Sequence, residues 1–142
     1  MKTKPVKIFV ADDDHDDQHL IKEALTIPSM STEVVPLYNG AQLLNSLSDC
    51  KESESKPDII ILDLNMPVMD GLTALIKLKR LADCADIPVY ILSTSKHDSD
   101  KKACELMGAK QFFTKPTSFN QLKLVAHQIL SQEFPDYLRT VN

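Results

Sequence analysis

The sequence predicts an α/β fold, a doubly wound parallel sheet of five strands with helices on both faces. Two observations predict it. Short runs of β-branched and other apolar residues alternate along the chain with longer stretches that place apolar residues at helical spacing, and such alternation is typical of parallel sheets. The run Ile59–Leu62 is apolar throughout and is followed by turn residues, as expected of a strand buried on both faces.

Five strands are expected from the apolar runs at residues 6–10, 34–35, 59–62, 89–92 and 112–114. Five helices are expected at residues 16–27, 41–47, 71–81, 98–107 and 118–133. End signals support these ranges: Pro28 closes the first helix, Asp98 or Ser99 caps the fourth, Gly108 ends it, and Ser118 caps the fifth. The polar stretch at residues 51–57 is expected to be an exposed loop.

Polar side chains stand at the ends of four of these strands. Asp12 and Asp13 follow the first strand, Asp63 follows the third, Ser93 follows the fourth, and Lys115 follows the fifth. The carboxyl ends of parallel strands lie at the same edge of a sheet, and open α/β sheets bind ligands there. We therefore expect these five residues to converge, although they are far apart in the sequence.

The chemistry of this set favours phosphoryl transfer. Several carboxylates in one place raise one another's pKa unless a cation joins them, and Mg²⁺ binds one or two carboxylates together with phosphate oxygens. Ser93 offers a hydroxyl and Lys115 a compact positive charge, and both suit a phosphoryl group. Pro116 favours a fixed turn after the fifth strand, and a cis bond is one way to form it. Asp14 is expected to cap the next helix.

These residues, with the segment Asp63-Leu64-Asn65-Met66-Pro67 and Met69-Asp70-Gly71 after it, resemble the receiver domain of response regulators in two-component signalling. The resemblance covers residues 5–133, leaves a short tail at residues 134–142, and implies a flavodoxin-like strand order of 2-1-3-4-5. It implies that Asp63 is the phosphoacceptor, and that Asp13, Asp63 and the backbone carbonyl of Asn65 ligate Mg²⁺. It further implies that Asp12 acts through water, that Ser93 is the switch hydroxyl, and that Lys115 pairs with the phosphoryl group.

Two residues depart from the commonest pattern of that family. Phe112 stands where Tyr is frequent, so a hydroxyl that can report ring rotation to a partner is absent. Two roles are open for Phe112: a switch residue whose ring repacks on phosphorylation, or a core residue. Thr94 stands beside the switch hydroxyl, where a smaller residue is often found. From its size we expect Thr94 to narrow access to the phosphoryl group and to slow its hydrolysis.

The resemblance implies a stand-alone response regulator in a phosphorelay, which acts catalytically only on itself. A sensor histidine kinase or histidine phosphotransfer protein is the expected phosphodonor. The tail leaves no room for an output domain, so output is expected through a downstream target protein, a homodimer, or onward transfer of the phosphoryl group to another carrier. The surface expected to act includes the helix at residues 98–107, the Phe112 strand and the last helix.

Composition limits the other classes of function. A net charge of -4 and a pI near 5.5 give no support to nucleic-acid binding. The three cysteines are odd in number and lack CxxC spacing, so neither a disulfide framework nor a zinc site is expected. Neither a membrane span nor a secretion leader is visible, and a cytoplasmic location is expected.

Three alternatives remain at this point. A receiver-like module that binds partners without phosphorylation need not keep all five site residues. A Mg²⁺-dependent phosphohydrolase usually has a second carboxylate two residues after its aspartyl nucleophile, whereas Asn65 stands there. A flavin-binding protein needs a phosphate-binding loop after its first strand, where this chain has acidic residues.

Overall fold

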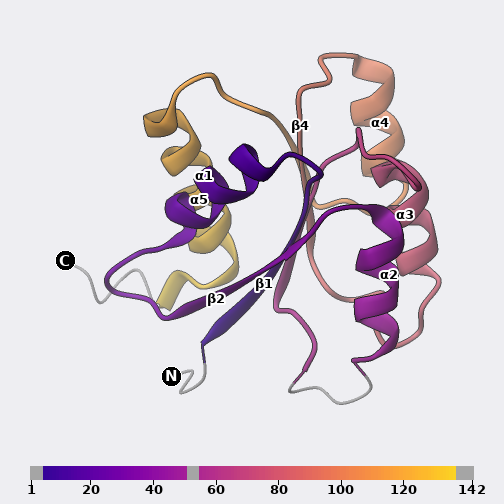
Figure 1. Cartoon of the computed structure of the whole chain (residues 1–142), viewed down its shortest axis with the longest axis horizontal. Helices are drawn as coiled ribbons and strands as arrows, with labels where there is room; N and C mark the ends of the chain where they lie inside the picture. The colour runs from indigo at the N-terminus through magenta and orange to yellow at the C-terminus, as the bar shows by residue number, and fades with distance from the viewer. Residues whose placement is uncertain (1–4, 51–54, 137–142) are drawn as a thin grey trace.

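The computed structural model describes residues 5–50 and 55–136, which form five strands and five helices in strict alternation (Figure 1). The elements are β1 Val6–Ala11, α1 His15–Leu25, β2 Thr32–Leu37, α2 Gly40–Ser48, β3 Ile59–Leu62, α3 Gly71–Lys79, β4 Val89–Ser93, α4 Asp98–Leu106, β5 Gln111–Thr114 and α5 Phe119–Glu133. This alternation confirms the predicted α/β class.

All five strands are parallel, in the order β2-β1-β3-β4-β5. The predicted strand order is therefore confirmed. Helices α1 and α5 cover one face of the sheet, and α2, α3 and α4 cover the other, so the twisted sheet is the middle of three layers (Figure 1). Because β3 is the central strand, all four of its residues are buried.

Two apolar cores fill the space between the layers. Along β1, Phe9 and Ala11 pack into the core beneath α2 and α3, whereas Ile8 and Val10 pack into the core beneath α1 and α5. Successive side chains of a strand point to opposite faces, so one strand serves both cores. The sheet is thereby held in place from both sides, which fixes the positions of the strand ends.

Four helices begin at a residue whose side chain accepts a hydrogen bond from the backbone N–H three positions later: Asp14, Asn39, Asp70 and Ser118. The predicted caps at Asp14 and Ser118 are thus confirmed. The prediction for α4 was wrong, because His97 is its N-cap residue and makes no side-chain cap hydrogen bond. Asp98 lies inside the first turn, where a carboxylate is favourable near the positive end of the helix dipole.

Other element ends differ from the prediction by a few residues. Strand β2 is longer than residues 34–35 and includes Pro36, which an edge strand tolerates because one side of it has no hydrogen-bonding neighbour. The described residues contain no cis peptide bond, so the turn at Pro116 forms with a trans bond. The expected exposed loop at residues 51–57 lies partly outside the described residues.

The cysteines, the start of the C-terminal tail and the lengths of the helices complete the fold. Cys50, Cys84 and Cys104 are buried and free. Phe134 packs against the core beneath α1 and α5, and residues 137–142 lie outside the described residues. Within the described part of the chain, every helix is too short or too polar to cross a membrane.

Candidate functional site

The predicted site residues do meet at the carboxyl edge of the sheet. Backbone hydrogen bonds between neighbouring strands fix them there: Asp12 N–H donates to Leu37 O at 2.9 Å, Asp63 N–H to Ala11 O at 2.9 Å, and Lys115 N–H to Ser93 O at 2.7 Å. Ser93 is the last residue of its strand, Asp12, Asp63 and Lys115 each come directly after one, and Asp13 follows Asp12. The sheet ladder itself therefore positions the backbone of the site.

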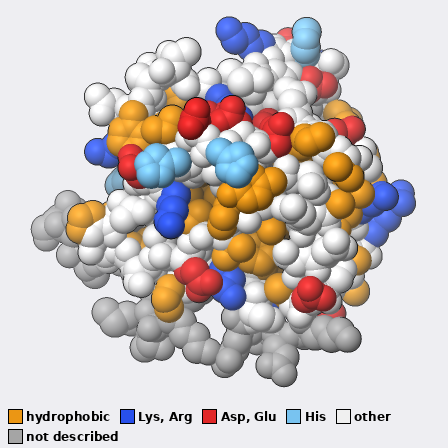
Figure 2. Space-filling model, in the orientation of Figure 1, with side chains coloured by type: hydrophobic (Ala, Val, Ile, Leu, Met, Phe, Trp, Pro, Cys, Tyr) orange, Lys and Arg blue, Asp and Glu red, His pale blue; other side chains and the backbone are white. Residues whose placement is uncertain are grey.

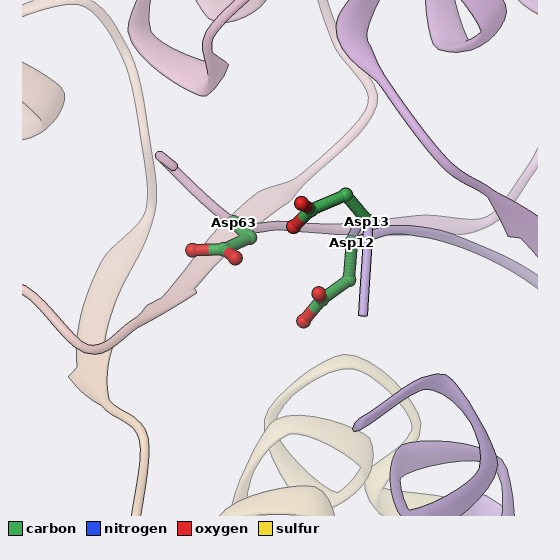
Figure 3. Close-up of side chains that lie close together, drawn as sticks. All are labelled: Asp12, Asp13 and Asp63. Carbon is green, nitrogen blue, oxygen red and sulfur yellow. The ribbon is translucent and has the colours of Figure 1, made fainter. Parts of the chain in front are cut away.

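Three carboxylates form its centre. Figure 3 shows Asp12, Asp13 and Asp63 side by side, and each has a carboxylate oxygen within 4.8 Å of one in the other two. Asp12 and Asp63 are buried, with 1% and 5% of their surface exposed, whereas Asp13 is exposed. On the face drawn in Figure 2, acidic side chains lie next to histidine side chains above the middle of the view, and further acidic side chains lie lower on the same face.

Burial changes the pKa of the Asp12 carboxyl. Desolvation raises the pKa of its carboxyl to about 6, although Lys115 and the backbone N–H of Asp14 act in the opposite direction. That N–H donates to Asp12 Oδ1 at 3.0 Å. The Asp12 carboxyl thus holds a proton more tightly than an isolated aspartate does, and a cation bound beside it would stabilise the ionised form.

Lys115 is the positive charge of the site. Its Nζ lies 2.7 Å from Asp12 Oδ2, 2.8 Å from Asp17 Oδ2 and 3.2 Å from Asp63 Oδ2. Burial alone lowers the pKa of this ammonium, but the three carboxylates outweigh burial and raise it. Lys115 therefore stays charged, and it contacts both buried carboxylates of the cluster.

The segment after β3 fixes Asp63. The N–H of Gly71 donates to Leu64 O at 2.9 Å, and a Cβ on Gly71 would lie 2.1 Å from Asp63 O. Only glycine fits against the backbone there. The N–H of Asn65 points to Asp63 Oδ1 at 3.4 Å, and the Asn65 side chain is exposed.

The predicted switch residue Ser93 ends β4, Thr94 directly follows it, and Phe112 lies on β5. Ser93 is fully buried, and its Oγ accepts a hydrogen bond from the N–H of Ser95 at 3.3 Å. Thr94, next to it, is exposed. Phe112 is partly buried; it packs against the core beneath α2 and α3 and lines a surface pocket with Ser95 and Thr114.

Sequence reasoning missed two residues of α1. Asp17 pairs with Lys115, and its position four residues after Asp13 at the start of a helix was the available signal. Gln18 is buried, and its Nε2 lies within 3.0 Å of the carbonyl oxygens of Val10, Asp12 and Leu37. Gln18 thereby ties α1 to the ends of β1 and β2.

The residues present fit a small divalent cation. Three carboxylates supply hard oxygen donors, which Mg²⁺ and Mn²⁺ prefer. Oδ2 of Asp12 is buried, and no described residue forms a hydrogen bond with it in good geometry, although Lys115 is within ion-pair distance. Buried oxygen atoms in this condition are suited to a cation or to its bound water.

Comparison with known proteins places the chain in a family. The model of the response regulator receiver domain matches residues 8–127. Response regulator Rcp1 of Synechocystis sp. is 30% identical over 120 residues, which are 83% of this chain and 82% of Rcp1. Transcriptional regulatory protein PrrA of Mycobacterium tuberculosis is 33% identical over 110 residues, which are 78% of this chain but 43% of PrrA.

Solved structures agree. The phosphorylated cyanobacterial phytochrome response regulator RcpA superposes with a TM-score of 0.83 and 30% identity, over 98% of both chains. The Mn²⁺-bound form of response regulator Rcp1 superposes with a TM-score of 0.80 and 29% identity, over 97% of this chain and 98% of that one. These two relatives match nearly the whole length of this chain.

Proposed function

The chain belongs to the response regulator receiver domain family, and on that premise we propose that it is a stand-alone response regulator of a two-component phosphorelay. In this proposal Asp63 accepts a phosphoryl group from a phosphohistidine on a sensor histidine kinase or a histidine phosphotransfer protein. The observation that carries the proposal is the convergence of Asp12, Asp13 and Lys115 on the buried carboxylate of Asp63. The phosphorylated relative RcpA and the Mn²⁺-bound relative Rcp1 support it.

The transfer follows from the positions of these groups. A carboxylate oxygen of Asp63 bonds to phosphorus, the bond from phosphorus to the histidine nitrogen breaks, and the leaving imidazole keeps the electron pair. Lys115, 3.2 Å from Asp63, donates to the oxygens over which the charge spreads. The product is an acyl phosphate, so the modification is reversible by hydrolysis. The chain acts catalytically only on itself.

Asp13, Asp63 and the backbone carbonyl of Asn65 would hold Mg²⁺, and Asp12 would act through water of the metal shell. When bound, Mg²⁺ neutralises charge on the transferring phosphoryl oxygens. The chain's own part is to present the carboxylates: Asp12 and Asp13 directly after β1, and Asp63 directly after β3.

The signal is proposed to pass through Ser93 and Phe112. A phosphoryl group adds about one to two negative charges, and the buried Ser93 hydroxyl is the nearby donor on β4 that can move to bond it. Phe112 then repacks beside the pocket it lines. The output surface would comprise α4, β5 and α5, where Leu106 and Leu124 are 81% and 69% exposed. A downstream protein or a second copy of the chain would bind there, in the cytoplasm.

Intact mass spectrometry tests this proposal. The chain is incubated with Mg²⁺ and acetyl phosphate, beside Asp63→Ala and the control Asp16→Asn, which removes one exposed carboxylate from the first turn of α1. We expect one phosphoryl group on the wild type and on the control, and none on Asp63→Ala or after chelation of Mg²⁺. If the wild type gains no mass although Mg²⁺ binds, a phosphorylation-independent interaction module becomes the better reading.

A further inference from the structure

Three carboxylates contact Lys115, and Asp17 is the one that belongs to a helix and not to a strand end. It lies in the first turn of α1, and its side chain is 36% exposed, whereas those of Asp12 and Asp63 are nearly buried. Its Oδ2 nevertheless lies 2.8 Å from Lys115 Nζ, which is closer than the 3.2 Å between Lys115 and Asp63. In the unphosphorylated chain the ammonium thus lies nearer to Asp17 and to Asp12, which is 2.7 Å away, than to the acceptor Asp63.

We propose that Asp17 is a positioning residue, which retains Lys115 on the α1 side of the site and so sets how readily the site accepts a phosphoryl group. This inference rests on the function proposed above. Phosphorylation replaces the single charge of Asp63 with a group of nearly two charges, and Lys115 must then donate to the new oxygens. Any contact of Lys115 with Asp17 that weakens during this step favours the unphosphorylated state.

The negative charge of Asp17 also favours the unphosphorylated state. Four carboxylates, those of Asp12, Asp13, Asp17 and Asp63, surround or adjoin one ammonium. A fourth negative charge favours a bound cation, but it repels an incoming phosphoryl group. Replacing Asp17 with Asn removes that charge and keeps the shape of the side chain. Lys115 keeps Asp12 and Asp63 as partners, so the substitution leaves no buried charge unpaired.

The test compares Asp17→Asn with wild type and with Asp16→Asn in Mg²⁺. Asp16 is the matched control because it is the preceding residue in the same turn, carries the same charge and is exposed. Two quantities are measured: the rate of phosphorylation by acetyl phosphate, and the concentration of beryllofluoride, a phosphoryl mimic, that half-saturates the chain.

We expect Asp17→Asn to raise the rate about three- to tenfold and to lower the half-saturating concentration by a similar factor, as for the loss of one partly exposed charged contact. Asp16→Asn should stay within about twofold of wild type, because long-range charge effects are screened by salt. The inference is overturned if Asp17→Asn has the same phosphorylation rate and the same half-saturating concentration as Asp16→Asn. It is also overturned if Asp17→Asn binds beryllofluoride more weakly than wild type does.

A second comparison separates positioning of Lys115 from a general effect on α1. In a Lys115→Gln background the ammonium is absent and only the direct charge repulsion by Asp17 remains, so Asp17→Asn should change beryllofluoride affinity by a smaller factor than it does beside Lys115. An equal factor in both backgrounds shows that Asp17 does not act through Lys115 and overturns the inference. Failure of the proposed function is distinguishable, because then the wild type itself neither gains a phosphoryl group nor binds beryllofluoride.

Discussion

Replacing Asp12 with Asn should change the pH dependence of folding in a defined direction. Burial raises the pKa of this carboxyl from 3.8 to about 6, so the folded state binds its proton more tightly than the unfolded state does. Protonation of Asp12 therefore stabilises the folded state. This stabilisation is fully present below pH 3.8 and is lost as pH rises through about 6. Its upper limit is about 3 kcal/mol, since one pKa unit corresponds to about 1.4 kcal/mol.

The assay is urea unfolding of wild type and Asp12→Asn between about pH 4.5 and 7.5, in the presence of a chelator. Asn does not titrate, so the free energy of unfolding of wild type relative to Asp12→Asn should fall across this range. The control Asp16→Asn removes an exposed carboxylate from the same part of the chain and is measured over the same pH range. A wild-type advantage that is constant, or that grows with pH, would refute the reasoning. Because a bound cation requires the ionised carboxyl, stabilisation by Mg²⁺ should conversely be larger at pH 7 than at pH 5.

Four further substitutions test other parts of the structure. Gly71→Ala should destabilise the chain by about 3 kcal/mol or more in urea unfolding and should abolish phosphorylation, because the new Cβ would lie 2.1 Å from Asp63 O. Val68 has a φ of 69° and is 83% exposed, so Val68→Asn should raise the free energy of unfolding by about 1 kcal/mol, and a β-branched Thr there should not. Gln18→Leu should cost about 2–4 kcal/mol, because three buried carbonyls lose their shared donor, and an unchanged urea midpoint would contradict that role. Thr94→Ala should speed loss of the phosphoryl group, followed as the decay of the phosphorylated mass, and an unchanged rate would count against the steric argument.

The sequence predicted the strand-end residues because one geometric rule covers them. Parallel strands place their carboxyl ends at one edge, so Asp12, Asp63, Ser93 and Lys115 had to converge once the strands were identified. The same regularity explains why the strand order and the covered faces followed from the alternation of elements. Successive residues of a strand point to opposite faces of the sheet, and this alternation alone predicts which of the two cores each strand residue enters.

Residues contributed by helices were harder to predict. The direction of a helical side chain depends on where the helix lies on the sheet, and periodicity alone does not give that position. Gln18 reads as one more polar residue of an amphipathic helix, yet it is buried. His97 as the cap of α4 was missed for another reason: Asp98 and Ser99 are residue types that often cap helices, but both lie inside the first turn.

Helix α1 contributes two residues that contact the strand-end residues of the site. Gln18 faces the sheet and binds the carbonyls at the ends of β1 and β2, whereas its neighbour Asp17 faces the fifth strand's Lys115. Gln18 therefore holds α1 against the backbone of Asp12, and Asp17, the residue before it, is held beside Lys115. The Gln18→Leu and Asp17→Asn variants together separate these roles, since the first should act mainly on stability and the second mainly on phosphoryl acceptance.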